Sequence, residues 1–219
     1  MTITIDLRLG DAFEIMPTLT GRYGLLFSDP PWNQGKDYGA TSDDDLPVAQ
    51  YIGRMRQVIE WGRAHTESRI ALLVGSKLTH LFWDLMPEAR LIVIKKGAIA
   101  TPTPDLFYRQ FASLFVTGKP YERCYDLWDG LRFPGEGYFF KEPRYPHPGL
   151  TSLKMTKRVL RYFSQEGDTV IDLFAGTGTT AVACIEMNRN FIGCEINPDY
   201  FAIAQQRITT AQAQTVMPL

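Results

Sequence analysis

Four consecutive residues, Asp29-Pro30-Pro31-Trp32, combine residue types that could act on the amino group of a nucleic-acid base. Such an amino group is a poor nucleophile, because its lone pair is delocalised into the ring. A site that methylates it should accept hydrogen bonds from both N–H groups and so draw the nitrogen toward tetrahedral geometry. The Asp29 carboxylate can accept one bond, and the Pro30 carbonyl, held by the stiff Pro-Pro pair, can accept the other. Trp32 offers a face for a base taken out of its stack.

Catalysis by such a site would depend on positioning and electrostatics, without a covalent intermediate. The alternative is structural, because the same tetrapeptide could be only a turn after a buried strand.

A second segment has the pattern of a nucleotide site. Residues 170–180 read as an apolar strand that enters a Gly176-Thr177-Gly178 turn and then a helix, and Ala181 stands where the dinucleotide pattern places a third glycine. The next apolar strand ends at Glu195, about 20 residues past the turn, where an acidic side chain can accept hydrogen bonds from both ribose hydroxyls. Glu195 could also be a helix N-terminal charge before Asn197-Pro198. Glycine spacing alone leaves a nicotinamide cofactor open.

The elements that must position these residues alternate between strands and helices. Strands are expected over residues 3–9, 23–28, 70–74, 91–94, 111–116, 169–173 and 191–194. Helices are expected over residues 12–19, 48–62, 78–85, 153–163, 180–187 and 200–208. Residues 35–47 are predicted to be a mobile loop, residues 120–148 irregular, and the tail after residue 210 frayed. The pattern predicts one α/β domain over residues 1–219, with a mainly parallel sheet covered by helices on both faces.

Composition excludes several protein classes. Hydrophobic residues make up 45% and charged residues 21% of the 219, which is typical of globular proteins. No apolar run approaches the roughly 20 residues of a membrane span, and the N-terminus does not resemble a signal peptide, so we expect a cytoplasmic protein. The three cysteines and three histidines show no metal-ligand spacing, so no metal is expected.

Charge is unevenly distributed along the chain. The net charge is −1, yet residues 119–161 hold nine basic against five acidic residues, interleaved with aromatic ones. This stretch predicts a nucleic-acid contact through Arg132, Lys141 and Arg144. The alternative is a solvated face above an aromatic core.

Taken together, these residues resemble the amino-methyltransferases of DNA. Asp29–Trp32 is similar to their D-P-P-[YFW] motif, residues 172–180 to their F-x-G-x-G cofactor loop, and residues 191–200 to their acidic cofactor strand. Gly10-Asp11-Ala12 resembles the segment that contacts the cofactor adenine, and His147-Pro148 the start of their H-P-x-x-K-P segment. The order, with the catalytic motif first, resembles the permuted β group. Residues 120–146 would be a small target-recognition insertion.

The resemblance implies a Rossmann-like, seven-stranded fold, S-adenosylmethionine as cofactor, and double-stranded DNA as partner. It implies catalysis by Asp29, Pro30, Pro31 and Trp32. It implies cofactor contacts from Asp11, Ala12, Asp29, Asp172, Phe174, Ala175, Gly176, Thr177, Gly178, Thr179, Glu195 and Asn197.

Several points depart from the family or stay open. Thr151 and Ser152 stand where the family has Lys and Pro. Asp29 favours N6 of adenine, because the N4-cytosine enzymes mostly carry Ser there. The Trp ending also resembles the RNA N6-adenine enzymes, which makes RNA the alternative substrate. A nicotinamide oxidoreductase and a silent partner subunit are the other classes considered. The β group also makes a homodimer possible, and a restriction-modification setting is expected.

Overall fold

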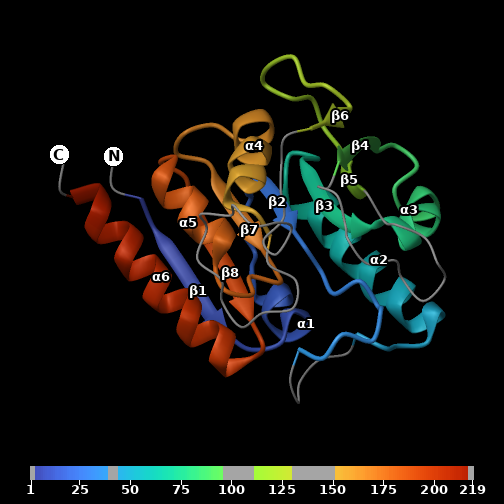
Figure 1. Cartoon of the computed structure of the whole chain (residues 1–219), viewed down its shortest axis with the longest axis horizontal. Coiled ribbons are helices and arrows are strands. Elements are labelled where there is room, and N and C mark those ends of the chain that lie inside the picture. Colours follow the sequence, from blue (N-terminus) through green and yellow to red (C-terminus); the bar gives the residue numbers. More distant parts are fainter. Residues whose placement is uncertain (1–2, 39–43, 96–110, 130–150, 217–219) are drawn as a thin grey trace.

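The computed structural model describes residues 3–38, 44–95, 111–129 and 151–216. Eight strands form one sheet in these ranges, with helices packed against it (Figure 1). The strands are β1 (Ile5–Leu9), β2 (Leu25–Ser28), β3 (Ile70–Gly75), β4 (Arg90–Lys95), β5 (Phe111–Val116), β6 (Leu127–Trp128), β7 (Thr169–Asp172) and β8 (Asn190–Glu195). The α-helices are α1 (Ala12–Ile15), α2 (Val48–His65), α3 (Thr79–Leu85), α4 (Leu153–Phe163), α5 (Thr179–Glu186) and α6 (Pro198–Val216). Two 3-10 turns, Met16–Thr18 and Ser76–Leu78, extend α1 and precede α3.

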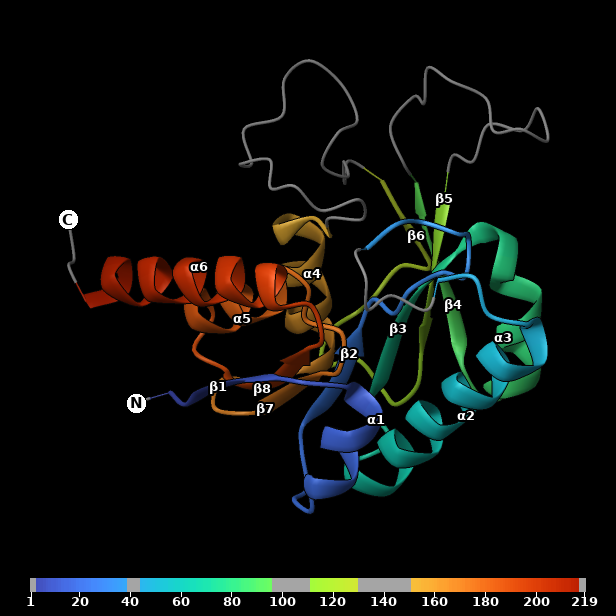
Figure 2. The same cartoon turned by 90° about the horizontal axis from the view of Figure 1, so that it is seen from below.

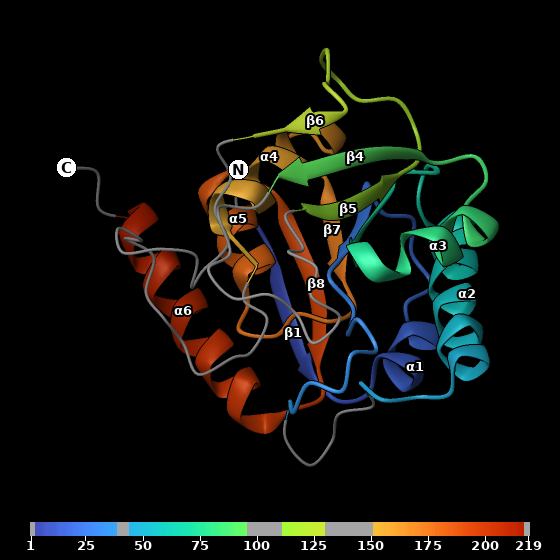
Figure 3. The ribbon, with the colours of Figure 1, turned by 45° about the vertical axis from the view of Figure 1, so that its right-hand side comes forward.

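The strand order is β1-β8-β7-β2-β3-β5-β4-β6. Figure 3 labels the two flanks of this sheet, β1, β8 and β7 on one side and β5, β4 and β6 on the other. Among the described strands, β5 alone runs against its neighbours, pairing antiparallel with both β3 and β4. All other pairs are parallel, which confirms the predicted mainly parallel sheet. The strand beyond the expected seven is the two-residue β6, within a stretch predicted to be irregular.

Helices cover both faces of the sheet, with α1, α2 and α3 on one face and α4, α5 and α6 on the other (Figure 2). The central strands supply both cores by simple alternation. Leu25 and Phe27 of β2 face the core beneath α4 and α5, whereas Leu26 faces the core beneath α2. This double burial explains why these strands are continuous apolar runs.

The strand order reverses between β7 and β2, which lie side by side. From β7 the chain continues outward through α5 to β8, and from β2 it continues the opposite way through α2 to β3. Loops at such a reversal diverge and leave a crevice beyond the carboxyl ends of the strands, where ligands of open α/β sheets bind. The Gly176 turn and the Asp29 tetrapeptide are the two loops that leave this point.

Some boundaries differ from the sequence expectation. Helix α6 continues to Val216, and the frayed tail expected after residue 210 is wrong, because Ala204, Ile208 and Ala211 bury one face of it. Helix α2 extends to His65, whose ring stacks on Trp61 at 4.7 Å between centroids. Strand β4 is only half-buried, with its two ends exposed.

None of the described helices is long and apolar enough to cross a membrane.

Candidate active site

The Asp29 carboxylate lies directly after β2, whose four residues are all buried. The indole N–H of Trp32 donates to Asp29 Oδ1 at 2.9 Å. The hydroxyl of Thr151, far away in the sequence, donates to Asp29 Oδ2 at 2.5 Å. Each carboxylate oxygen therefore has one protein donor and keeps capacity for another hydrogen bond.

The surroundings of Asp29 favour its neutral form more than water does. Burial raises the pKa of Asp29 to about 6, and the charge of nearby Asp172 adds to the increase. The bonds from Thr151 and Trp32 and the charge of Lys36 oppose it. The carboxylate is thus ionised at neutral pH, but it is a stronger base than an exposed aspartate.

Three contacts fix the Trp32 ring. Besides the bond to Asp29, its six-membered ring lies against Gly75 at the end of β3, where an added Cβ would come within 2.8 Å of ring atom Cε3. The Lys36 ammonium lies 5.4 Å from the ring centroid. The sequence predicts only that Trp32 stacks on a base. The structure adds an orienting role for its N–H.

The segment after Trp32 is organised by the buried carboxylate of Asp44. Asp44 accepts hydrogen bonds from the backbone N–H groups of Asn33 at 2.6 Å, Gln34 at 3.2 Å and Lys36 at 2.8 Å. The Asn33 side chain bonds both the N–H and the carbonyl of Leu46, at 2.6 and 2.8 Å. The loop predicted to be mobile over residues 35–47 is therefore tied down on both sides of residues 39–43, which lie outside the described range.

The turn after β7 has the backbone of a close-approach loop. Gly176 and Gly178 have φ of 53° and 79°, which favour glycine. A Cβ on Gly178 would lie 2.9 Å from the Ala204 Cβ of α6. From the same helix, Arg207 donates to the Thr177 carbonyl at 2.7 Å and to the Thr177 and Thr179 hydroxyls at 2.9 and 3.1 Å. Helix α6 therefore holds this turn in place.

Glu195 ends β8 beside that turn. Its carboxylate accepts the Gly176 N–H at 2.7 Å and the Asn197 N–H at 2.8 Å. Burial raises the pKa of the Glu195 carboxyl above its usual value, and these two hydrogen bonds oppose that increase only in part. The Ile196 backbone also acts on this carboxylate. A carboxylate offers about four acceptor positions, so Glu195 keeps capacity to accept a ribose hydroxyl. A carboxylate next to a turn that excludes Cβ atoms fits the ribose and backbone contacts of a nucleoside cofactor.

Asp172 and Asn197, two of the residues predicted to contact the cofactor, make hydrogen bonds within the protein. Asp172 accepts the Thr180 hydroxyl at 2.6 Å and the Phe174 N–H at 3.1 Å, so it shapes the turn from beneath. The side-chain oxygen Oδ1 of Asn197 accepts the N–H groups of Asp199 and Tyr200 and so caps α6. The side-chain N–H₂ of Asn197 donates to the Tyr38 carbonyl at 2.7 Å. Both side chains therefore support the shape of the site, and their contact with a cofactor stays a prediction.

The end of β1 completes this side of the crevice. The Gly10 N–H donates to the Glu195 carbonyl at 2.9 Å, which brings Asp11 to the end of β8. Asp11 caps α1 by accepting the Phe13 N–H at 2.9 Å. Ala12 is buried in the core beneath α1, so only its backbone could face a ligand. The Phe174 ring meets Phe13 edge-on at 6.4 Å.

The predicted nucleic-acid contacts Arg132, Lys141 and Arg144, and the His147-Pro148 segment, lie outside the described residues. In the described part of the basic stretch, Lys157 pairs with Glu186 and Arg161 with Glu122. Arg158 lies 5.5 Å over the Trp128 ring. The charges of Lys157 and Arg161 are thus compensated locally.

Comparison with known proteins identifies the family. The N6_N4_Mtase family, described as DNA methylase, matches residues 105–206. The DNA adenine methyltransferase YhdJ of Escherichia coli is 36% identical over 245 residues, an alignment that covers 92% of this chain and 82% of that protein. The chain belongs to the DNA amino-methyltransferase family. The type II methyltransferase M.HpaI of Haemophilus parainfluenzae is 25% identical over 213 residues and is covered to 67% of its length, against 84% of this chain.

Several solved structures share the fold of this chain. The M1.HpyAVI–SAM complex aligns with a TM-score of 0.67 at 22% identity, covering 93% of this chain and all of that one. The cytosine-N4-specific PvuII DNA methyltransferase aligns with a TM-score of 0.70 at 14% identity, covering 98% and 93%. At these identities the likeness establishes the fold alone, a Rossmann-like methyltransferase sheet.

Several residues that build the site carry no clear signal in the sequence. Thr151 was noted only as a departure from the family pattern, yet it bonds Asp29. Gly75 and Arg207 gave no local signal, because their partners Trp32 and Thr177 are distant in the chain. Asp44 sits in the run Asp43-Asp44-Asp45, which reads as solvated charge.

Proposed function

We propose that this methyltransferase transfers a methyl group from S-adenosylmethionine to N6 of adenine in double-stranded DNA. The observation that carries the proposal is the Asp29 carboxylate, held by Trp32 and Thr151 at the crevice between β7 and β2. Its two oxygens retain acceptor capacity, which an exocyclic amino group requires.

The cofactor fits the other side of the same crevice. S-adenosylmethionine, when bound, supplies a methyl group activated by the positive sulfonium. The Glu195 carboxylate would hold the ribose hydroxyls, and the 176–178 turn would approach through its backbone. Asp11 and Phe174, at the ends of β1 and β7, would border the adenine. Asp172 and Arg207 would keep the turn in shape.

At the target base, the chain's own groups do the positioning. Asp29 and the Pro30 carbonyl would accept the two N–H groups, which concentrates the lone pair on nitrogen and directs it toward the methyl group. Formation of the N–C bond would break the bond between the methyl carbon and the sulfonium sulfur, which would leave as a neutral thioether. The positive charge would then lie on the amino nitrogen, with one proton too many. The Asp29 carboxylate can accept that proton, since its raised pKa makes it the stronger base. The proton is then released to solvent.

Adenine is favoured over cytosine for two reasons. The aspartate at position 29 is the residue that the N6-adenine enzymes share, and the N4-cytosine enzymes mostly have Ser there. YhdJ, which matches over most of both chains, is named as an adenine methyltransferase. DNA contacts would come from Arg132, Lys141 and Arg144 in the insertion over residues 120–146.

The test is methyl transfer from labelled S-adenosylmethionine to unmethylated duplex DNA and, in parallel, to RNA. The products are digested to nucleosides and identified by mass spectrometry. N6-methyladenine in DNA is the expected result. N4-methylcytosine would overturn the choice of base, label in RNA alone would overturn the choice of substrate, and cofactor binding without label would indicate a silent subunit. The Asp29→Ala variant, prepared in the same way, serves as the blank.

A further inference from the structure

Thr151 contacts a residue that is distant from it in the sequence. Its hydroxyl donates to Asp29 Oδ2 at 2.5 Å, across 122 positions of sequence. The bond is charge-assisted, because its acceptor is a carboxylate that is ionised at neutral pH. It is separate from the Trp32 bond, which reaches the other oxygen.

Thr151 directly precedes the N-cap of a helix. Ser152, the next residue, is buried and is the N-cap of α4, accepting the Met155 N–H through its side chain. Thr151 therefore stands one residue outside a capped helix, in a place that the helix fixes.

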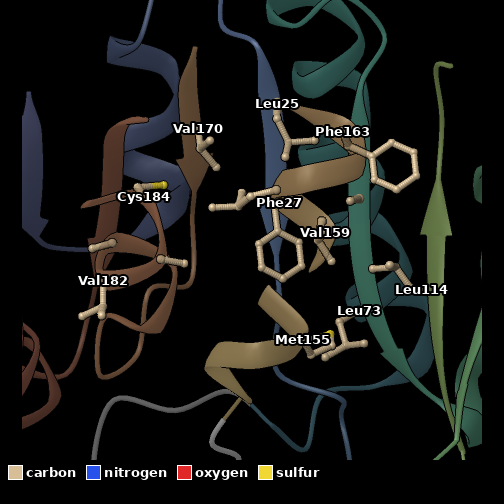
Figure 4. Packing of buried hydrophobic residues seen from close by; sticks show 14 of the residues in the cluster. Leu25, Phe27, Leu73, Leu114, Met155, Val159, Phe163, Val170, Val182 and Cys184 are labelled. Carbon is tan, nitrogen blue, oxygen red and sulfur yellow. The ribbon is translucent and has the colours of Figure 1, made fainter. Parts of the chain in front are cut away.

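A shared core fixes the two ends of this contact relative to each other. Met155, Val159 and Phe163 of α4 are buried in one cluster with Leu25 and Phe27 of β2, and Figure 4 shows these side chains gathered between helix and sheet. Asp29 follows β2 directly, and Thr151 lies just before α4. The packing of β2 against α4 thus sets the hydroxyl beside the carboxylate.

We propose that Thr151 is a positioning residue, which with Trp32 fixes the rotation of the Asp29 carboxylate and aims its remaining lone pairs at the base. A carboxylate held by one donor can turn about its Cβ–Cγ bond, whereas one held at both oxygens by rigid groups cannot. This inference deepens the proposed function and rests on it, because the proposed function identifies the bound group as a base. The contact itself does not depend on the substrate.

The hydroxyl also acts on the charge of Asp29. Lys36 and Tyr38 from the loop after Trp32, Tyr51 from α2 and Asp172 from β7 are the other titratable groups that act on this carboxylate. The Thr151 bond favours the ionised form, against burial and Asp172. Its loss should therefore raise the pKa of Asp29 and leave less active carboxylate at a given pH.

Thr151→Val removes the hydroxyl at nearly constant volume, and Thr151→Ser keeps it. For Thr151→Val we expect kcat to fall about 10- to 100-fold, with KM values for DNA and cofactor little changed. The acidic limb of the kcat–pH profile should move upward by about one pH unit. Thr151→Ser should restore most of the rate and the original limb.

The same substitution at Thr156, inside α4, gives a matched control. The Thr156 hydroxyl is buried and has no hydrogen-bond partner among the described residues. Thr156→Val should leave the pH profile in place and keep or increase thermal stability. Thr151→Val acting no differently from Thr156→Val would overturn the inference.

A second readout separates this inference from the proposed function. The carboxyl carbon of Asp29, followed by ¹³C NMR against pH and assigned with Asp29→Asn, reports its pKa without any turnover. A higher pKa in Thr151→Val than in wild type and Thr151→Ser supports the positioning role, even if wild type were to methylate no DNA. An equal pKa in all three proteins, with unchanged pH–rate profiles, would refute the role, even if wild type were fully active.

Discussion

At the scale of single residues, the site depends on a carboxylate whose ionised form is destabilised by burial. Asp29 is desolvated and lies near Asp172, and two protein hydrogen bonds compensate only in part. Asp29→Ala should lower kcat by at least about 100-fold, because the amino group loses its principal acceptor. The dissociation constant of S-adenosylmethionine should change little. Single-turnover rates and calorimetric titration measure the two, with Asp45→Ala, at an exposed neighbouring carboxylate, as control. Undiminished turnover would remove Asp29 from the mechanism.

The same carboxylate should make stability depend on pH. The native carboxyl holds its proton up to pH about 6, whereas an unfolded aspartate loses it near 3.8. Between these values the native state binds more protons, so stability falls as pH rises, and the full penalty is present above pH 6. Asp29→Asn should therefore stabilise the protein at pH 8 by about 1–2 kcal/mol. This value is smaller than the full pKa difference implies, because the Asp29 side chain is only half-buried and solvent screens its charge. Denaturant unfolding of both proteins at pH 4 and pH 8 tests this, and a difference that does not grow with pH contradicts it.

Glu195 tests the cofactor half in isolation. Glu195→Gln keeps the size of the side chain but removes the charge that would bind two ribose hydroxyls. The dissociation constant of S-adenosylmethionine should rise at least about 10-fold, which corresponds to about 1.4 kcal/mol. Calorimetry measures it, with the exposed Glu166→Gln as control. The two variants binding equally well would sink the assignment of Glu195.

At the scale of elements, Gly178 shows why a glycine can be needed for packing. Its φ of 79° is strained for any other residue, and a Cβ would also meet Ala204 of α6. Gly167 has a similar φ of 85° but open space around its missing Cβ. Gly178→Ala should therefore lower the free energy of unfolding by about 1–3 kcal/mol more than Gly167→Ala, which costs backbone strain alone. Equal losses in urea unfolding would mean that α6 yields to the added methyl group.

This result also limits what a Gly178 variant can say about function. A loss of cofactor binding in Gly178→Val would follow from displacement of α6, which carries Arg207 and hence the support of Thr177. Binding of the cofactor is better judged at Glu195, where the side chain can change without a new clash.

Elements were also what the sequence predicted best. Helix α4 was placed residue for residue, because the apolar stripe through Met155, Val159 and Phe163 has helical spacing. The Asp29 tetrapeptide and the Gly176 turn were placed correctly at strand ends. The Thr151 bond and the Gly75 contact were beyond local patterns, since each joins segments that only the folded sheet brings together.

At the scale of the whole molecule, the order of motifs along the chain matters less than the order of strands in the sheet. The Asp29 tetrapeptide comes early and the glycine turn late, yet β2 and β7 are neighbours, paired in parallel through Leu25 and Leu26. Alternating strands and helices predicted this class of fold. The antiparallel β5 and the short β6 depend on side-by-side pairing that periodicity does not encode.

Binding to DNA is also a property of the whole molecule, because a net charge of −1 gives no general attraction to phosphate. Local cations must therefore supply it. We expect these cations to include Arg132, Lys141 and Arg144 of the basic, aromatic-rich stretch. Lys157 and Arg161 of the same stretch are paired with acids. Replacing these three with Ala should weaken DNA binding at low salt and reduce the slope of log K against log salt by up to about 3. The Lys157→Ala/Arg161→Ala protein should change that slope much less. Fluorescence anisotropy at several salt concentrations measures both, and equal slopes in the triple variant and wild type would mean that these cations only solvate the surface.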